Sequence, residues 1–106
     1  MTVYVDNYRV PATVNRIKGR WSHLTADTVE ELNAFAAGIG LKPEWFQVCK
    51  KRCGPEGAPC PHWHYDVTDP KREAAIAAGA QAIELRQFGD LITARRAEYR
   101  AAMESQ

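Results

Sequence analysis

The residue types best suited to chemistry gather in one stretch of the sequence, Cys49–Val67. It holds all three cysteines of the chain, in the order Cys49-x3-Cys53-x6-Cys60-x-His62, with His64 close behind. Three thiolates and one imidazole form a recognised tetrahedral zinc set. The spacing is not that of a common zinc finger, so incidental cysteines or one regulatory disulfide are the alternatives. We predict a structural zinc ion bound by Cys49, Cys53, Cys60 and His62, with His64 as the alternative fourth ligand.

The composition of this loop explains why it would need a metal ion. Between Lys50 and Pro61 it has almost no apolar side chain, and its prolines and glycines exclude a helix or a central strand. It cannot bury enough surface to offset the roughly 1–2 kcal/mol per residue that ordering a backbone costs. Its basic residues would favour the thiolate forms, and they are the expected contacts for any nucleic acid or nucleotide. These basic residues are Lys50, Lys51 and Arg52.

The residues that follow the loop alternate in character, which predicts a strand over His62–Val67. Period two places His62, His64 and Asp66 on one face of this strand and Trp63, Tyr65 and Val67 on the other. An H-x-H-x-D pattern can ligate a catalytic metal ion that keeps open positions for water. The simpler interpretation, which we favour, makes the aromatic face core, His62 a zinc ligand, and His64 and Asp66 half-exposed polar groups.

A second group of candidates consists of aspartates at the ends of predicted strands: Asp6, Asp27 and Asp66. If these strands are parallel, all three carboxylates lie at the carboxyl edge of the sheet, where open α/β sheets place their ligand sites. Converging carboxylates there could bind Mg²⁺ or Mn²⁺ for phosphoryl or nucleotide chemistry, and His23 could join them. The alternative roles are a helix cap for Asp27 and a turn position for Asp6. The catalytic candidates are therefore Asp6, His23, His64 and Asp66.

Four short strands are predicted to position these residues, over 2–5, 21–26, 62–67 and 82–85, and residues 7–19 are expected to be irregular. Three helices are expected between and after them: one from the capping box at Thr28, one from Thr68 to Gly79, and one over 86–106. Strands that alternate with helices predict an α/β fold with a small, mostly parallel sheet. At 106 residues the chain is expected to form a single domain, 1–106, with the zinc loop 49–62 as an insertion.

Finer features of the helices also follow from the pattern. Asp27 competes with Thr28 as the first N-cap, and Pro43 begins one further turn. In the last helix, four arginines are expected to lie largely off the apolar stripe: Arg86, Arg95, Arg96 and Arg100.

Charge and hydropathy narrow the class of protein. The formal net charge is +1, so no global field draws the chain onto nucleic acid or an anionic membrane. The N-terminus lacks the basic and apolar regions of a signal peptide, and the apolar windows are too short to span a bilayer. We therefore expect a soluble, cytoplasmic protein without a membrane partner.

Several of these motifs together resemble a known family. They are VYVD at Val3–Asp6, WSHL at Trp21–Leu24, and HYDV at His64–Val67 followed by an alanine-rich helix to Gly79. Over roughly residues 1–90 the chain is similar to bacterial and phage proteins classed as domain of unknown function 4031. The resemblance implies no established activity, cofactor or partner. It also implies that the cysteine loop is a variant elaboration, whereas His23, His64 and Asp66 belong to the shared motifs.

Two hypotheses of different class follow. The leading one is a small zinc-stabilised domain that acts as a binding or regulatory module and is phage-associated. The alternative is a metal-dependent hydrolase or nuclease that acts on nucleotides or nucleic acid at the carboxyl edge of the sheet.

Overall fold

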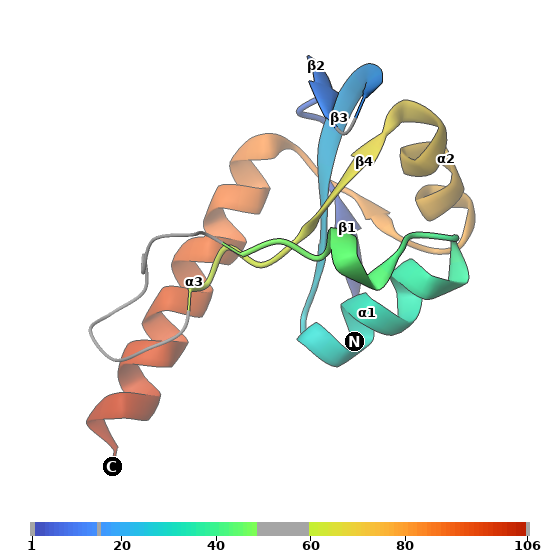
Figure 1. Ribbon diagram of the computed structural model, residues 1–106. Helices are drawn as coiled ribbons and strands as arrows, with labels where there is room; N and C mark the ends of the chain where they lie inside the picture. The colour runs from blue at the N-terminus through green and yellow to red at the C-terminus, as the bar shows by residue number, and fades with distance from the viewer. Residues whose placement is uncertain (1, 15, 49–59, 106) are drawn as a thin grey trace.

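The sheet is built around one long strand, β3 (Ile17–Ala26), in the computed structural model, which describes residues 2–14, 16–48 and 60–105 (Figure 1). The other strands are β1 (Val3–Val5), β2 (Val10–Val14), β4 (Tyr65–Thr68) and β5 (Gln81–Ala82). The helices are α1 (Val29–Gly38), α2 (Asp69–Ala77) and α3 (Leu85–Glu104), and a single 3-10 turn, η1, covers Pro43–Trp45.

Within the described residues the sheet has five strands and is mixed, so the prediction of a mostly parallel sheet with four strands is wrong. β1, β2 and β4 all pair antiparallel with β3, and β5 pairs parallel with β1. The reason lies partly in the connection between β2 and β3. β2 ends at Val14 and β3 begins at Ile17, and strands joined by so short a turn pair antiparallel.

β1 and β2 lie along the same side of β3 and behave as one interrupted strand. At Leu24 and again at Trp21, β3 is paired on both sides at once. One partner is β4 in both cases, and the other is β1 at Leu24 and β2 at Trp21. β4 therefore occupies one side of β3, and β1 and β2 share the opposite side.

The interruption between β1 and β2 is a bulge with two extra residues. The Asp6 N–H donates to the His23 carbonyl at 3.0 Å, and the next pair along is Val10 with Trp21. Three residues, 7–9, thus face the single residue Ser22, whose Oγ accepts from the Arg9 N–H at 3.1 Å. Arg9 takes a positive φ of 48°, as a sharp local bend requires.

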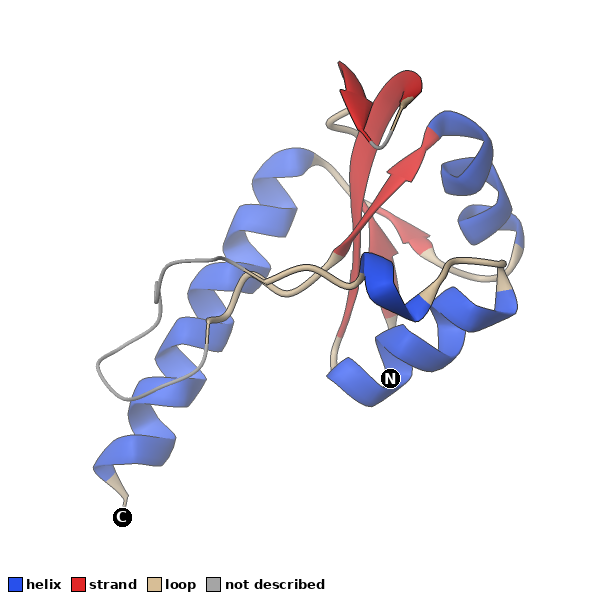
Figure 2. Cartoon of the chain, viewed as in Figure 1, coloured by secondary structure: helices blue, strands red, loops and turns tan. Residues whose placement is uncertain are grey.

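Helices cover the two faces of the sheet unequally (Figure 2). α1 and α2 pack on one face, where the larger core lies. α3 crosses the other face and makes a smaller core there. The sheet residues of the larger core are Val3, Val5, Leu24, Ala26, Tyr65 and Val67. The smaller core consists of Ile83, Phe88 and Ile92, with Tyr4 and Leu91 packed against it.

Local predictions from capping and periodicity are largely confirmed. Thr28 is the N-cap of α1, because its Oγ1 accepts from the Glu31 N–H at 3.1 Å, and Pro43 begins η1. The alternation over 62–67 is present, with Trp63, Tyr65 and Val67 buried and the residues between them half-buried.

Two local predictions are wrong. Residues 10–14 form β2 rather than an irregular segment, because Pro11 is tolerated on an edge strand. Arg95 is 7% exposed and belongs to the buried side of α3. No helix in the described part of the chain is long and apolar enough to span a membrane.

Candidate functional site

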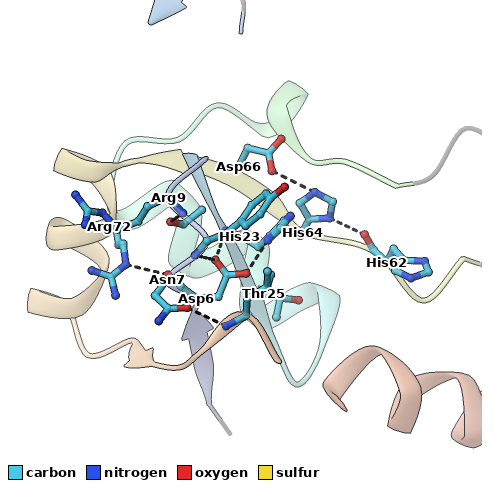
Figure 3. Close-up of polar contacts among 12 residues, drawn as sticks. Asp6, Asn7, Arg9, His23, Thr25, His62, His64, Asp66 and Arg72 are labelled. Carbon is cyan, nitrogen blue, oxygen red and sulfur yellow. Dashed lines mark hydrogen bonds and ion pairs between the residues drawn. The ribbon is translucent and has the colours of Figure 1, made fainter. Parts of the chain in front are cut away.

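The candidate site lies on the sheet face that α3 covers, where β3, β4 and the bulge after β1 meet. Antiparallel pairing sets His23 of β3 directly opposite Asp66 of β4, so both side chains point to the same face. His64, two residues before Asp66, shares that face. Figure 3 shows these three side chains gathered together, with Asp6 beside them.

Asp6 is fully buried, and its carboxylate is surrounded by donors. Oδ1 accepts from the main-chain N–H of His23 at 2.9 Å and of Tyr8 at 3.1 Å. Oδ2 lies 2.6 Å from Nδ1 of the His23 ring. A carboxylate can only accept, so Nδ1 of His23 donates to it and Nε2 keeps its lone pair when the ring is neutral. The bulge creates this arrangement, because it turns the chain back over His23 just after Asp6.

His64 is fixed in the same way by a different acceptor. Its Nδ1 lies 2.6 Å from the main-chain oxygen of His62, and a carbonyl oxygen can only accept. Nδ1 of His64 therefore carries a hydrogen, and Nε2 faces Oδ1 of Asp66 at 3.3 Å. The other oxygen of Asp66, Oδ2, accepts from Nε2 of Gln47 at 2.7 Å.

These contacts orient three metal-ligating groups toward one another. One ligand atom from each of His23, His64 and Asp66 lies within 4.8 Å of the other two. All three side chains are half-buried. In the described residues this is the one cluster of at least three His, Cys, Asp or Glu groups that could hold a metal ion. Two imidazoles and one carboxylate leave coordination positions open, as catalytic metal sites require.

Two aromatic rings enclose His23. Phe88 of α3 stacks on the imidazole with ring centroids 4.5 Å apart, and Tyr8 of the bulge stacks at 5.4 Å. The His64 ring meets His23 edge-on at 5.1 Å. Tyr8 remains 46% exposed, so the site opens to solvent on its side of the sandwich.

Burial and charge shift the proton affinities of His64 and Asp66 in opposite directions. Burial alone would lower the pKa of His64, but its hydrogen bonds to Asp66 and His62 and the negative charges of Asp66 and Asp6 outweigh it and raise that pKa. Burial alone would raise the pKa of Asp66, but its contacts with His64 and Gln47 prevail and lower it. His64 and Asp66 therefore attract each other as an ion pair when no metal ion replaces the proton on Nε2.

A buried arginine of α3, Arg95, fixes the segment that precedes β4. Its guanidinium donates to the carbonyls of Pro61 (2.9 Å) and Ala26 (2.7 Å) and to Oγ1 of Thr25 (2.6 Å). It also stacks 3.5 Å from the centre of the Trp63 ring. Burial lowers the pKa of Arg95. Pro61 and Trp63 flank His62, and Arg95 donates to the main-chain carbonyls of both. Arg95 therefore fixes the main chain on each side of the His62 carbonyl that orients His64.

The predicted site residues fall into three groups. Asp6, His23, His64 and Asp66 lie together in the structure, where Asp6 holds His23 rather than joining the ligand cluster. Asp27 does not join them, which corrects the predicted edge of three aspartates. Because β1 and β3 are antiparallel, Asp27 lies at the opposite edge, where its carboxylate accepts from the Thr2 N–H at 2.8 Å and the Tyr4 hydroxyl at 2.9 Å.

The predicted zinc ligands are only half described. Sγ of Cys60 lies 3.7 Å from Nδ1 of His62, and the His62 N–H donates to that sulfur at 3.3 Å. Figure 3 shows the His62 ring turned away from His23. Cys49 and Cys53 lie outside the described residues, as do the basic residues Lys50, Lys51 and Arg52.

Four residues of the site were not predicted as site residues from the sequence: Tyr8, Gln47, Phe88 and Arg95. For Arg95 a signal existed, because it continues the spacing of Phe88 and Ile92 toward Tyr99, which is that of a buried helix seam. Tyr8 and Gln47 lie in segments without periodicity, and the contacts that place them are long-range.

Fold and site together define the class: a small mixed α/β domain with a His–His–Asp cluster on one face of its sheet. The family described as "Protein of unknown function (DUF4031)" matches residues 3–95. The chain belongs to this family, which confirms the resemblance found in the sequence motifs. No curated protein and no solved structure matches the chain. The matched region includes Asp6, His23, His64 and Asp66 and ends at Arg95.

Proposed function

We propose that this protein is a metal-dependent hydrolase whose single catalytic ion is bound by His23, His64 and Asp66. The observation that carries the proposal is the fixation of both imidazoles at Nδ1. The Asp6 carboxylate holds one ring and the His62 carbonyl holds the other. Carboxylate and carbonyl partners at Nδ1 are the usual supports of metal-ligating histidines, because they fix the tautomer and make Nε2 more basic.

The donor set favours zinc over the Mg²⁺ or Mn²⁺ expected from converging carboxylates. Imidazole ligands suit Zn²⁺, whereas Mg²⁺ prefers an octahedral shell of oxygen atoms. Zinc–ligand bonds of about 2.1 Å in a tetrahedron place neighbouring ligand atoms about 3.4 Å apart. Since the three ligand atoms lie within 4.8 Å of one another, and Nε2 of His64 is already 3.3 Å from Oδ1 of Asp66, binding would draw no pair together by more than about 1.4 Å.

The protein side chains supply the remaining requirements of hydrolysis. A bound Zn²⁺ would lower the pKa of a coordinated water and polarise a substrate carbonyl or phosphoryl oxygen. Asp6 would keep His23 in the ligating tautomer, and Phe88 would exclude water from one face of that ring. Tyr8, half exposed above the other face, lies where substrate would enter.

Metal binding and hydrolysis in matched variants test this proposal. We expect His64→Gln and Asp66→Asn to lose one equivalent of Zn²⁺ and all metal-dependent hydrolysis of a panel of aryl esters, blocked peptides and phosphodiesters. Asp27→Asn is the matched control at the other sheet edge and should retain both. Unchanged zinc content in His64→Gln would overturn the metal site. Hydrolysis that survives chelation but is lost in His23→Gln would instead indicate metal-free acid–base catalysis by His23 and Asp6.

A second proposal is the structural zinc ion of the cysteine loop, bound by Cys49, Cys53, Cys60 and His62. The 3.7 Å separation between Cys60 Sγ and His62 Nδ1 supports it. Tetrahedral bonds of about 2.3 Å to sulfur and 2.1 Å to nitrogen would place these two atoms about 3.6 Å apart. Cys60→Ser should release one zinc equivalent and lower the midpoint of thermal unfolding, whereas the hydrolytic site should keep its own ion. A zinc content unaffected by Cys60→Ser would contradict this second site.

Nucleic-acid binding through Lys50, Lys51 and Arg52 and an association with phage remain predictions from the sequence. Binding of nucleic acid would weaken steeply with salt, because phosphate contacts release counterions. A flat salt response would exclude it.

A further inference from the structure

A groove of about 600 Å³ runs along the outer edge of β4 and reaches Asp66. This volume lies within the range of about 300–1,000 Å³ found for ligand sites. The segment around η1 forms one wall and the hairpin of β2 and β3 forms the other, while residues 66–68 line it between them. Because Asp66 lines the groove and also belongs to the proposed metal cluster, the groove lies beside that cluster.

The edge of β4 in this groove is open to a further strand. Gln47 and His64 form two main-chain hydrogen bonds of 2.9 and 3.1 Å. The residues just before Gln47 leave this edge and form η1. Main-chain groups of alternate residues in a strand point to the same side, so those of Asp66 share the direction of His64. Within the described residues, neither the N–H nor the carbonyl of Asp66 has a hydrogen-bond partner across this edge. Such an edge is a template for strand addition.

The walls of the groove are suited to apolar side chains and unsuited to phosphate. Most of the lining is apolar, and its largest groups are Trp21, Trp45 and Phe46. Its charged groups are two carboxylates, Glu44 and Asp66, and one ammonium, that of Lys71. The Lys71 ammonium donates to the Ile39 carbonyl at 2.7 Å and keeps its charge, which offsets that of Glu44. Because Asp66 is paired with His64, the lining carries little net charge, which suits the main chain and apolar side chains of a peptide better than a polyanion.

We propose that the groove binds an extended peptide with large apolar side chains at alternate positions, which adds to β4 as a strand. The inference rests on the proposed hydrolase for its chemical consequence, which is cleavage of a peptide bond brought to the metal site. In that step the oxygen of water bonds to the carbonyl carbon and the C–N bond breaks. The amine takes up both protons of that water and leaves as an ammonium, and the acid remains as a carboxylate. Peptide binding itself requires no metal ion.

A soluble probe peptide with alternating side chains tests the groove. The probe is acetyl-(Phe-Lys)₃-amide, and its binding to metal-stripped protein is followed by tryptophan fluorescence. Two further peptides carry N-methyl groups on the phenylalanines or on the lysines. Only alternate N–H groups of an added strand face β4, so we expect one methylated peptide to bind at least about tenfold more weakly and the other to bind like the probe. Equal binding of both would overturn strand addition and indicate a pocket for aromatic rings.

Two surface variants distinguish peptide binding in the groove from nonspecific binding elsewhere on the protein surface. Ile17→Lys places a charge in the wall at a side chain that is 45% exposed, and it should abolish binding. Met103→Lys changes a 38% exposed side chain on α3, away from the groove, and should leave binding intact. Self-association that Ile17→Lys removes would mean that a second copy occupies the groove, which overturns the proposal. Peptide binding without any zinc binding would contradict the proposed hydrolase and leave the peptide groove supported. Zinc binding without any peptide binding would contradict the groove and leave the metal site supported.

Discussion

The two faces of the sheet differ in what they bury. The face under α1 and α2 carries the larger apolar core, and β3 contributes Leu24 and Ala26 to it, both at most 1% exposed. The face under α3 carries His23 and Thr25 from the same strand, together with Asp66 from β4. Its apolar core has three buried residues. Neighbouring residues of one strand thus serve opposite purposes.

This contrast shows how a small domain can bury a polar cluster and stay stable. Burying polar groups costs free energy unless hydrogen bonds compensate for it, so the stability must come from elsewhere. The larger core supplies it on one face, while on the other face the acceptors for His23 and His64 are provided by Asp6 and a main-chain carbonyl. Substitutions on the two faces should therefore have separable effects.

The largest expected effect is a loss of stability from a substitution in the larger apolar core. Leu24→Ala removes a fully buried side chain and should lower the free energy of unfolding by about 2–5 kcal/mol, because a cavity remains. Urea denaturation measures this loss. The zinc affinity of the folded fraction should stay near that of the unsubstituted protein. A large loss of zinc affinity with little loss of stability would contradict the separation of the faces.

An intermediate effect is expected for the support of His23. Asp6→Asn puts an amide beside Nδ1, which favours the wrong tautomer, and should weaken zinc binding at the cluster about 10–100-fold. Calorimetric titration with Zn²⁺ measures this change. Asp27→Asn makes the same chemical change at the opposite edge and should leave the affinity unchanged. Equal losses in both variants would mean that the effect is one of overall charge.

The smallest effect concerns the pH dependence of stability in metal-free protein. The raised pKa of His64 stabilises the fold fully below about pH 6.5, and this contribution is lost as the pH rises through the folded value. The lowered pKa of Asp66 stabilises the fold above about pH 3.8, and this is lost as the pH falls through its folded value. The pair should therefore contribute most near pH 5–6, by about 1 kcal/mol.

His64→Gln is the variant that checks this dependence. Its free energy of unfolding, measured with chelator present, should fall furthest below that of the unsubstituted protein near pH 5–6 and approach it at pH 8. A difference that stays constant with pH would show that the two side chains do not interact as charges.

Period and capping made much of the local structure predictable. Alternation over 62–67 assigned Tyr65 to the core and Asp66 to the polar face, and Thr28 marked the start of α1. The direction of the strands was not predictable in this way, because alternation and helix order are compatible with either pairing. Because the strands were predicted to be parallel, Asp27 was assigned to the wrong edge of the sheet.

The candidate site was predictable in its residue types and not in its roles. Asp6 and His23 were candidates, but their contact depends on the bulge, and residues 7–9 show no pattern that reveals one. Arg95 was expected to lie largely off the apolar stripe of the last helix, but it is buried on that stripe. Several of its partners are main-chain carbonyls, which every residue has and which leave no trace in a sequence.

The bulge between β1 and β2 has a consequence for redesign and for divergence within the family. Its excess is two residues, an even number, so the inward and outward alternation of the strand is the same before and after it. Deleting two of residues 7–9 would leave one residue opposite Ser22 and keep Val10 opposite Trp21, so β2 would hold its register on β3 and no side chain would turn to the opposite face. The sheet could therefore lose or regain the turn that holds Asp6 against His23 while its hydrophobic pattern stayed intact. The contacts that hold the His–His–Asp cluster can therefore change without loss of the fold.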